Sequence, residues 1–361
     1  MGGVWLTAVL MLAFSSAVRS CPPSDLEALL AFKSALRDPD DGVLNSWTGT
    51  DCCRRWYGVS CDRNSGSVAE ISLRAGPVYS TFEKPFRPQH MSGYISPEIC
   101  KLSGLSSLII TDWKGISGEI PRCITSLSFL SIIDLSGNRI AGSLPPDMGS
   151  LGHLSLLSAA DNLIGGEIPV SLTRLSGLMH LDLRNNKISG PIPQKLGRLQ
   201  MLSRVLLSGN LISGPIPGSL CHIYRLVDLD LSNNHLSGPI PEALGRMAVL
   251  ATLKLDRNRL SGSIPGTLLG SGISELNLSH NMLEGNIPDT FRGSCYFTLL
   301  DLSYNYLKGP LPASISSSSY IGYFDVSHNH LCGPIPITYS TTHPSSFSYN
   351  DCLCGKPLKP C

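Results

Sequence analysis

Leucine and isoleucine recur along most of the chain in one fixed register. The core pattern is L-x-x-L-x-L-x-x-N-x-L, for example Leu178, Leu181, Leu183, Asn186 and Ile188. A Gly-x-(Ile/Leu)-Pro segment occurs ten times, and eight of its nine intervals are 24 residues long, while the other is 23. A unit of this length cannot bury its own apolar face, so the pattern predicts stacked repeats with one continuous core.

Each L-x-L segment predicts a short strand whose leucines point inward and whose intervening residues point outward. Strands that stack repeat upon repeat form a parallel sheet. An asparagine stands at the same place after nine of these strands, and its amide can both donate to and accept from the backbone groups that a turn leaves unpaired. The predicted asparagine ladder consists of Asn138, Asn162, Asn186, Asn210, Asn234, Asn258, Asn281, Asn305 and Asn329.

The start of the chain predicts a targeting segment and then a cap. An apolar run from Val4 to Phe14, with small residues before Cys21, fits a secretory signal peptide over residues 1–20, although no basic residue precedes the run. A retained N-terminal anchor is the alternative. After it, Ser24 and Glu27 have capping-box spacing, and a short amphipathic helix is expected from its leucines. These leucines are Leu26, Leu29, Leu30 and Leu36.

The twelve cysteines favour an oxidising compartment. Eight of them form one cluster at each end of the repeats, and neither cluster has the spacing of a zinc site. Cys100 and Cys123 occupy nearby positions in successive repeats and are candidates for a further bridge. Cys221 and Cys295 lie about three repeats apart, too far for one disulfide, and are expected to be buried thiols. The clustered cysteines are Cys21, Cys52, Cys53, Cys61, Cys332, Cys352, Cys354 and Cys361.

The repeat is interrupted in two places. Residues 76–92 insert a segment with prolines and aromatic residues into the first repeat, and such a loop is either functional or an extension of the cap. In the second repeat, Asp112-Trp113-Lys114-Gly115 stands where the ladder asparagine belongs.

These motifs resemble the plant extracellular class of leucine-rich repeats. The block from Asp25 through Cys52-Cys53 to Cys61 resembles the N-terminal cap of that class, and Leu331-Cys332-Gly333 through Cys361 resembles the C-terminal cap of polygalacturonase-inhibiting proteins. Residues 111–127 and 201–210 are similar to the plant proteins named for DNA-damage repair and toleration.

The resemblance implies an α/β repeat protein, a right-handed leucine-rich-repeat solenoid with a parallel concave sheet and disulfide-stapled caps. The expected divisions are the signal peptide at 1–20, an N-terminal cap at 21–67, repeats at 68–337 and a C-terminal cap at 338–361. By similarity to the inhibitor caps, the implied disulfides are Cys21–Cys52, Cys53–Cys61, Cys332–Cys352 and Cys354–Cys361.

Charge and hydropathy limit the classes of partner that the chain can be expected to bind. The net charge is +1, and removing residues 1–20 takes away only Arg19, which leaves 27 basic and 27 acidic side chains. A chain without a basic excess has no electrostatic footprint for nucleic acid. No later stretch has the length of apolar sequence that a membrane anchor needs. We therefore expect a monomeric, secreted cell-wall protein without a cofactor or a bound metal.

Function is expected on the concave face, at outward positions that the repeat leaves free. Aspartates before the second strand leucine belong to the repeat itself, so less stereotyped residues are better candidates. A solvated face with cross-strand ion pairs is the alternative reading of the same set. The predicted partner-binding residues are His180, Arg184, Arg204, Asp228, Lys254, Arg257 and Glu275.

No catalytic group emerges from the sequence. Asp228 and Asp230 sit two residues apart on one strand beside basic residues, and His328 and His330 flank a ladder asparagine. The one N-glycosylation sequon is at Asn277, on a predicted concave strand, where a glycan would obstruct binding.

Three functions remain open on the sequence. The first is a protein-binding scaffold that inhibits a secreted hydrolase such as a polygalacturonase, and the second is a peptide or co-receptor module in defence or stress signalling. The third is ice binding by a column of serines, namely Ser208, Ser232, Ser279, Ser303 and Ser327.

Overall fold

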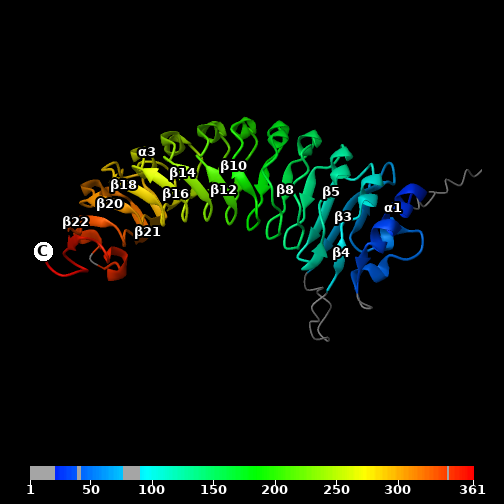
Figure 1. Cartoon of the computed structure of the whole chain (residues 1–361), viewed down its shortest axis with the longest axis horizontal. Helices are drawn as coiled ribbons and strands as arrows, with labels where there is room; N and C mark the ends of the chain where they lie inside the picture. Colours follow the sequence, from blue (N-terminus) through cyan, green and yellow to red (C-terminus); the bar gives the residue numbers. More distant parts are fainter. Residues whose placement is uncertain (1–20, 39–41, 76–89, 340) are drawn as a thin grey trace, which may run out of the picture.

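The computed structural model describes residues 21–38, 42–75, 90–339 and 341–361. The predicted signal peptide and most of the interrupting segment at 76–92 lie outside the described residues. The repeats stack side by side into a single arch, with the N-terminal cap at one end and the C-terminal cap at the other (Figure 1).

A twelve-stranded sheet lines the inner, concave side of the arch (Figure 1). All neighbouring strands in it are parallel except the first pair, and each short strand buries its middle residue while the two flanking residues face outward. The strands are β2 (Val59–Cys61), β3 (Val68–Arg74), β5 (Ser107–Thr111), β7 (Ile132–Asp134), β8 (Leu156–Ser158), β9 (His180–Asp182), β11 (Arg204–Leu206), β13 (Asp228–Asp230), β15 (Thr252–Lys254), β17 (Glu275–Asn277), β19 (Tyr296–Asp301) and β21 (Tyr320–Asp325).

A second set of strands follows the ladder asparagines and forms a sheet of its own, which the sequence pattern did not predict. Segments such as Leu211–Gly214 alternate between buried and exposed residues and end in a glycine with a left-handed φ, 81° at Gly214. Its strands are β10 (Ser189–Pro191), β12 (Leu211–Gly214), β14 (His235–Gly238), β16 (Arg259–Gly262), β18 (Met282–Asn286), β20 (Tyr306–Gly309), β22 (His330–Pro334) and β23 (Cys352–Cys354). A smaller sheet near the N-terminus joins β1 (Leu36–Arg37), β4 (Ser92–Tyr94) and β6 (Gly115–Ser117).

Short helices cover the outer, convex side, most of them directly after the Gly-x-(Ile/Leu)-Pro prolines (Figure 1). Proline supplies the fixed φ of the residue before each turn and needs no hydrogen-bond acceptor. The 3₁₀-helices are η1 (Val43–Ser46), η2 (Pro97–Lys101), η3 (Arg122–Ser126), η4 (Met148–Ser150), η5 (Val170–Arg174), η6 (Leu196–Arg198), η7 (Gly218–His222), η8 (Glu242–Arg246), η9 (Ala313–Ser317), η10 (Ile337–Tyr339) and η11 (Pro344–Phe347). The described α-helices are α1 (Pro23–Ser34), α2 (Cys52–Arg55) and α3 (Gly266–Leu269).

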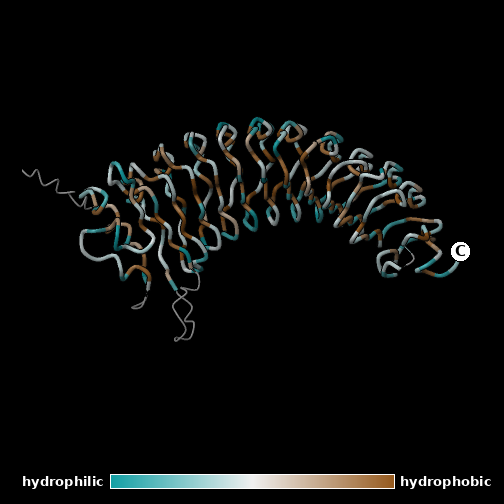
Figure 2. Tube along the Cα trace, turned by 180° about the vertical axis from the view of Figure 1, so that it is seen from behind, coloured by the Kyte–Doolittle hydropathy of each residue, from teal (hydrophilic) through white to brown (hydrophobic). Residues whose placement is uncertain are grey.

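Leucines and isoleucines of successive repeats form one core between the two sides of the arch, seen as brown segments alternating with teal along each coil (Figure 2). The asparagine ladder runs beside this core. In the middle, Asn186 donates from Nδ2 to the carbonyls of Ala159 at 2.8 Å and Arg184 at 3.0 Å, and its Oδ1 accepts from the amide of Ile164 at 2.9 Å. Each such side chain therefore links one repeat to the preceding one through buried backbone groups.

Two features of the ladder go beyond the asparagines that the sequence predicted. Trp113 stands at its start, in register with Asn138, and its buried indole N–H donates to the carbonyl of Leu73 at 3.0 Å. Indole is a donor only, so it replaces one half of an asparagine amide. At the other end, Asn350 of the C-terminal cap accepts from the amide of Leu331 at 3.0 Å and extends the ladder by one position.

The N-terminal helix corrects a prediction. The predicted Ser24–Glu27 capping box is wrong. The helix α1 begins at Pro23, so Ser24 already lies inside it, and the N-cap residue, Pro22, has no side chain that could cap the helix. Proline is favoured at this first position because its missing N–H would have no partner there. Leu30, predicted to face inward, is exposed, and the buried face contains Asp25, whose carboxylate accepts from the amide of Val68 at 2.8 Å.

Five disulfides are present in the described chain. Four of them join the pairs that the inhibitor caps imply: Cys21–Cys52, Cys53–Cys61, Cys332–Cys352 and Cys354–Cys361. The fifth, Cys100–Cys123, connects η2 to η3 on the convex side. Two thiols are free. Cys295 is buried, whereas Cys221 is only half-buried, and burial raises the pKa of the Cys221 thiol.

Candidate functional site: the concave face

The outward residues of the concave strands form rows that cross the arch in register. One row changes character along its length, with apolar residues at both ends and charged residues in the middle. It reads Ile132, Leu156, His180, Arg204, Asp228, Thr252, Glu275, Leu299 and Tyr323.

Four of the seven predicted partner-binding residues, His180, Arg204, Asp228 and Glu275, lie in the middle of this row, and Lys254 and Arg184 form ion pairs on the same part of the face. Arg204 Nε is 2.6 Å from Asp228 Oδ2, and Lys254 Nζ is 2.8 Å from Glu275 Oε1. Arg184 contacts Asp182 at 2.7 Å, and this hydrogen bond raises the pKa of Arg184. Two of the pairs cross adjacent strands and the third stays within one repeat, so much of the central charge is balanced inside the chain.

Arg257 is separate from the other six. It occupies the position directly before a ladder asparagine, with a left-handed φ of 53°, at the edge of the concave sheet. Next to it along the arch, His280 takes the same position. Burial, followed by the positive charge of Arg257, lowers the pKa of His280.

The central surface is shallow. A depression of about 300 Å³ lies among Leu156, His180, Asp182, Arg204 and Leu206. Asp228 accepts a hydrogen bond from Arg204, while Asp230 accepts one from the hydroxyl of Ser232 at 2.7 Å. The two aspartates of strand β13 therefore have different partners. This surface is suited to contact with another macromolecule, because it offers apolar patches beside ion pairs without enclosing a small molecule.

Acidic residues further along the face are less well neutralised. Burial raises the pKa of Asp256 to about 6, and neighbouring Asp230 adds to the effect. Burial also raises the pKa of Asp301, against the lowering effect of the hydrogen bonds from Ser303. Neither carboxylate has an ion-pair partner in the described part of the chain.

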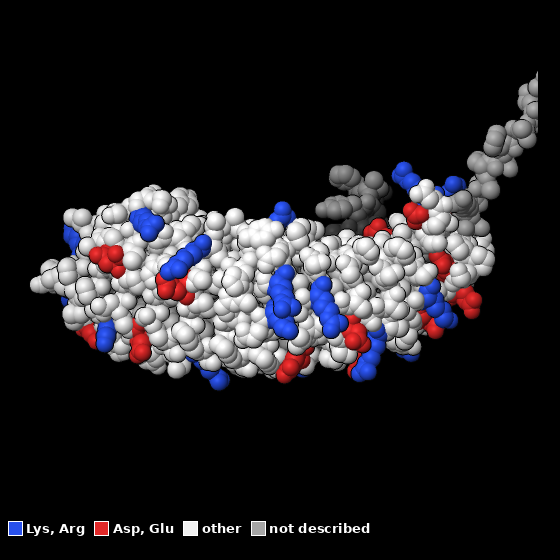
Figure 3. Space-filling view, turned by 90° about the horizontal axis from the view of Figure 1, so that it is seen from above, with Lys and Arg blue, Asp and Glu red and all other residues white. Residues whose placement is uncertain are grey.

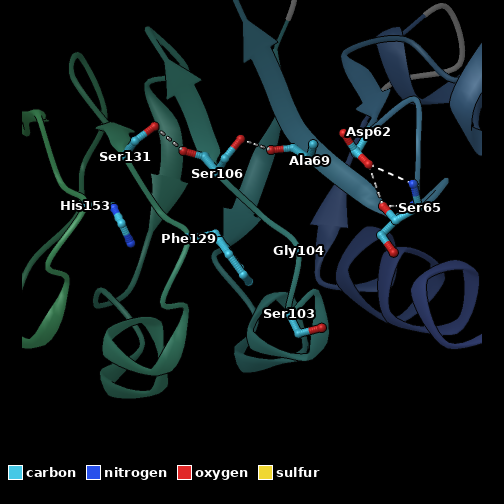
Figure 4. Close-up of a pocket in the computed structure, with 10 residues that line it drawn as sticks. Asp62, Ser65, Ala69, Ser103, Gly104, Ser106, Phe129, Ser131 and His153 are labelled. Carbon is cyan, nitrogen blue, oxygen red and sulfur yellow. Dashed lines mark hydrogen bonds between the residues drawn. The ribbon is translucent and has the colours of Figure 1, made fainter.

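A larger groove of about 740 Å³ lies where the N-terminal cap meets the first repeats (Figure 4). Phe129 and His153 lie beside it, and Asp62 stands at its cap end. The hydroxyls of Ser106 and Ser131 donate to backbone carbonyls of the preceding repeat, Ala69 at 2.9 Å and Ser106 at 2.9 Å. The hydroxyls of these serines are therefore already engaged in hydrogen bonds. The groove could not be predicted from the sequence, because its residues come from separate repeats.

The sequon lies on the concave strand β17. Asn277 Oδ1 accepts from the amide of Ser279 at 3.1 Å and from its hydroxyl at 2.7 Å. Across the sheet, Asn277 is in register with Lys254 on one side and Asp301 on the other. A glycan carried here would lie between those two side chains.

Three of the five serines in the column proposed for ice binding do not form an exposed surface, whereas Ser208 and Ser232 are half-buried. Ser279, Ser303 and Ser327 are buried, with 4–5% exposed, and the hydroxyl of Ser303 donates to Asp301 at 2.7 Å. Period-two reasoning placed these serines outward, but the chain turns inward at this point toward the ladder asparagine. Their hydroxyls are not available to order water.

Aromatic residues gather at the C-terminal end of the face, and the sequence-based choice of site missed them. Four rings stack in a column: His280 on Tyr304 at 4.1 Å, Tyr304 on His328 at 3.9 Å, and His328 on Tyr349 at 4.2 Å. All four residues occupy the same position of the repeat, directly before the asparagine, and Tyr304 and His328 are 24 residues apart. This shared position was the signal in the sequence that could have predicted the column.

The convex face contrasts with this arrangement. Figure 3 shows scattered basic and acidic groups there, separated by wide uncharged areas. Within the described residues, no helix has the length and apolar character to cross a membrane. The three cysteine sulfurs that cluster in the N-terminal cap belong to two disulfides.

Stacked repeats, the asparagine ladder and disulfide caps define the chain as a plant-type leucine-rich-repeat protein. Residues 22–62 match the leucine rich repeat N-terminal domain, and five stretches match the leucine-rich-repeat family: 129–151, 177–199, 225–247, 272–294 and 296–318.

Among known proteins, the chain is similar to the Arabidopsis thaliana DNA damage-repair/toleration protein DRT100, with 52% identity over 136 residues, 37% of each chain. It is also 31% identical to polygalacturonase inhibitor 1 of Oryza sativa subsp. japonica, over 37% of this chain and 36% of that protein. The match to phytosulfokine receptor 1 of Arabidopsis thaliana, at 32% identity, covers 39% of this chain and 13% of the receptor. The chain thus covers well under half the length of these relatives, to which it is related as a leucine-rich-repeat protein.

Two solved structures share the fold over nearly the whole chain. A plant ice-binding protein superposes with a TM-score of 0.69 at 28% identity, over 95% of this chain and 99% of that one. The Arabidopsis receptor kinase HAESA, in complex with the peptide hormone IDA and the co-receptor SERK1, gives a TM-score of 0.70 at 29% identity, over 92% of this chain and 59% of that one.

Proposed function

We propose that the chain is a secreted, non-enzymatic scaffold of the plant cell wall that binds another protein through its concave face. The observation that carries this proposal is the concave sheet itself, where in-register rows place apolar, acidic and basic side chains on one curved surface. Repeat solenoids use such surfaces for binding, because curvature brings many repeats against one partner. The relatives named as a polygalacturonase inhibitor and as receptors support the same class of activity.

A secreted hydrolase of the polygalacturonase type is our first choice of partner. The chain is 31% identical to one such inhibitor over 37% of its length, and its C-terminal cap holds the two disulfides expected from the sequence resemblance to inhibitor caps. The test is pectin hydrolysis by a panel of fungal polygalacturonases, with and without the purified protein. Inhibition of at least one enzyme is expected, and unchanged hydrolysis across the panel would rule out the inhibitor assignment.

Arg204→Glu is a matched reporter of the assigned face. The substitution puts a carboxylate beside Asp228 and should weaken a partner docked on the central stretch, while the exposed ion pair itself contributes only about 0.2–1 kcal/mol to stability. Lys187→Glu, which changes an exposed residue of the neighbouring repeat edge, serves as control. Equal inhibition by both variants would place the contact away from the central stretch.

Peptide or co-receptor binding is the second candidate, favoured by the overall match to a receptor that binds a peptide hormone. Pull-down of membrane receptor kinases from plant extracts with the wild-type chain and Arg204→Glu separates the two proposals. Ice binding, which the match to an ice-binding protein keeps open, is checked by thermal hysteresis, and none should be found if the concave face is a protein-binding surface.

A further inference from the structure

The C-terminal third of the concave face differs from the rest of the arch in its aromatic residues. Tyrosine is concentrated there: three exposed tyrosines, Tyr296, Tyr320 and Tyr323, lie in strands β19 and β21, while the exposed Tyr304 and Tyr349 come directly before Asn305 and Asn350. We define the tyrosine surface as Tyr296, Leu299, Tyr304, Tyr320, Tyr323 and Tyr349.

Backbone strain marks this surface. In every repeat the residue before the ladder asparagine has a left-handed φ, and in the earlier repeats it is Gly, Asp or Asn, which accept that conformation readily. From Arg257 onward the same position holds larger side chains, namely Arg257, His280, Tyr304, His328 and Tyr349, with φ between 53° and 57°. Bulky side chains at such positions are unfavourable, and conformational outliers of this kind cluster at binding sites.

The rings are also held in place before any partner arrives. Tyr304 lies between His280 and His328, and Tyr349 closes the column with 75% of its surface exposed. At the opposite edge of the sheet, Tyr296 stacks on Tyr320 at 4.9 Å. Rings fixed by stacking lose little side-chain freedom on binding, which is why Tyr is enriched among the residues that dominate interfaces.

Between the two aromatic edges the floor of the surface is acidic. Tyr323 sits beside Leu299 in register, and its hydroxyl donates to Asp325 at 3.1 Å. Asp301 is in register with Asp325 on the next strand, and neither has an ion-pair partner in the described chain. Burial and Asp325 raise the pKa of Tyr323 to about 12, in keeping with a negative potential at this point.

We propose that the tyrosine surface docks a basic, arginine-bearing segment of a protein partner. Arginine fits both features, because its planar guanidinium stacks on aromatic rings and pairs with carboxylates through parallel hydrogen bonds. The inference rests on the proposed protein-binding function and places the dominant contacts at the C-terminal third of the face, beyond the central ion pairs.

The test uses labelled twelve-residue peptides of alternating Arg and Ser, with Lys–Ser and Glu–Ser peptides as comparisons, titrated against the full chain by fluorescence anisotropy. Two variants remove the surface: Tyr304→Asn with Tyr349→Asn, and Tyr323→Ser. Asparagine already occupies the same position at Asn185 and Asn233, so the first variant relieves backbone strain and should fold. Leu156→Ser is the matched control, an outward residue of the same row as Tyr323 but seven strands away.

The Arg–Ser peptide should bind the wild-type chain more tightly than the Lys–Ser peptide, and the Glu–Ser peptide should not bind. Both tyrosine variants should weaken Arg–Ser binding about ten-fold or more, the loss expected for interface anchors, while Leu156→Ser leaves it unchanged. No binding to the wild type at millimolar peptide, or equal loss in Leu156→Ser, overturns the proposal. So would tyrosine variants that lose affinity for an oligogalacturonide and keep the Arg–Ser peptide, because the surface would then be a saccharide site.

Failure of this inference is distinguishable from failure of the proposed function. If a hydrolase is inhibited equally by the wild type and the tyrosine variants, the scaffold function stands and the tyrosine surface is not its docking site. If no hydrolase or receptor binds any form of the chain while the Arg–Ser peptide does, the surface stands and the proposed function fails.

Discussion

A single asparagine side chain carries much of the link between neighbouring repeats. Asn186 satisfies the carbonyls of Ala159, Leu183 and Arg184 and the amide of Ile164, all at a buried site. The geometry explains why the residue type is fixed there: Asp lacks the donors, and Leu would leave the amide of Ile164 without its acceptor and remove one donor from each carbonyl, which would keep only its other donor.

Asn186→Ala should lower the free energy of unfolding by about 1–3 kcal/mol, because the buried amide of Ile164 loses its acceptor and three carbonyls lose a donor. Urea denaturation followed by circular dichroism measures the change. Lys187→Ala, at the exposed neighbouring position, should stay within about 0.5 kcal/mol of the wild type. Equal stability of the two variants would contradict the ladder's role.

Asp256 gives a pH-dependent prediction. Burial raises the pKa of its carboxyl in the folded chain to about 6, above its unfolded value, so the folded state binds the proton more tightly. The contribution of this carboxyl to the free energy of unfolding therefore falls as pH rises from about 4 through 6, because the charged form is disfavoured in the folded state.

Asp256→Asn should accordingly stabilise the protein by about 1 kcal/mol at pH 7.5, after allowance for the partial solvent screening of this site, and by less at pH 5. Unfolding free energies of both forms at the two pH values provide the measurement. A gain that is larger at pH 5 than at pH 7.5 would be the wrong sign.

At the scale of elements, the disulfide between η2 and η3 is the one that joins two regular repeats. Cys100 and Cys123 are separated by 23 residues, so the bond restricts the unfolded chain over one repeat. A Cys100→Ser, Cys123→Ser double variant should lose about 2–4 kcal/mol of stability. The thermal midpoint, compared with that of Cys221→Ser, which removes a free thiol, tests this, and equal midpoints would contradict it.

Some secondary-structure elements could be predicted from the sequence and others could not. The concave strands followed directly from L-x-L alternation, because one face of every strand is buried. The second sheet did not, since β12 and its neighbours span only a few residues before a left-handed glycine and look like turns in the sequence. Likewise, α1 began at proline rather than at the serine that the capping-box pattern selected.

At the scale of the whole molecule, a glycan on the concave side of the arch would obstruct partner binding more than a glycan on the convex side. Asn277 lies on β17, between the central ion pairs and the tyrosine surface. If the sequon carries a glycan, partner affinity should rise in Asn277→Gln, because the sugar no longer occupies the concave face. Binding of the hydrolase or peptide to glycosylated protein, enzymatically deglycosylated protein and the variant measures this, and a glycan present without effect would place the contact elsewhere.

The sequence by itself determined the repeat, the direction of its strands, the buried leucines and the asparagine positions, because these depend on contacts that recur every 24 residues. It also marked the outward residues from which any site must be drawn. Only the tertiary structure decided which of them meet: Arg204 with Asp228, Lys254 with Glu275, and Tyr304 between two histidines. The physical reason is that a repeat pattern fixes the direction of a side chain, whereas its partner belongs to the next repeat and depends on lateral register, rotamer and backbone turn.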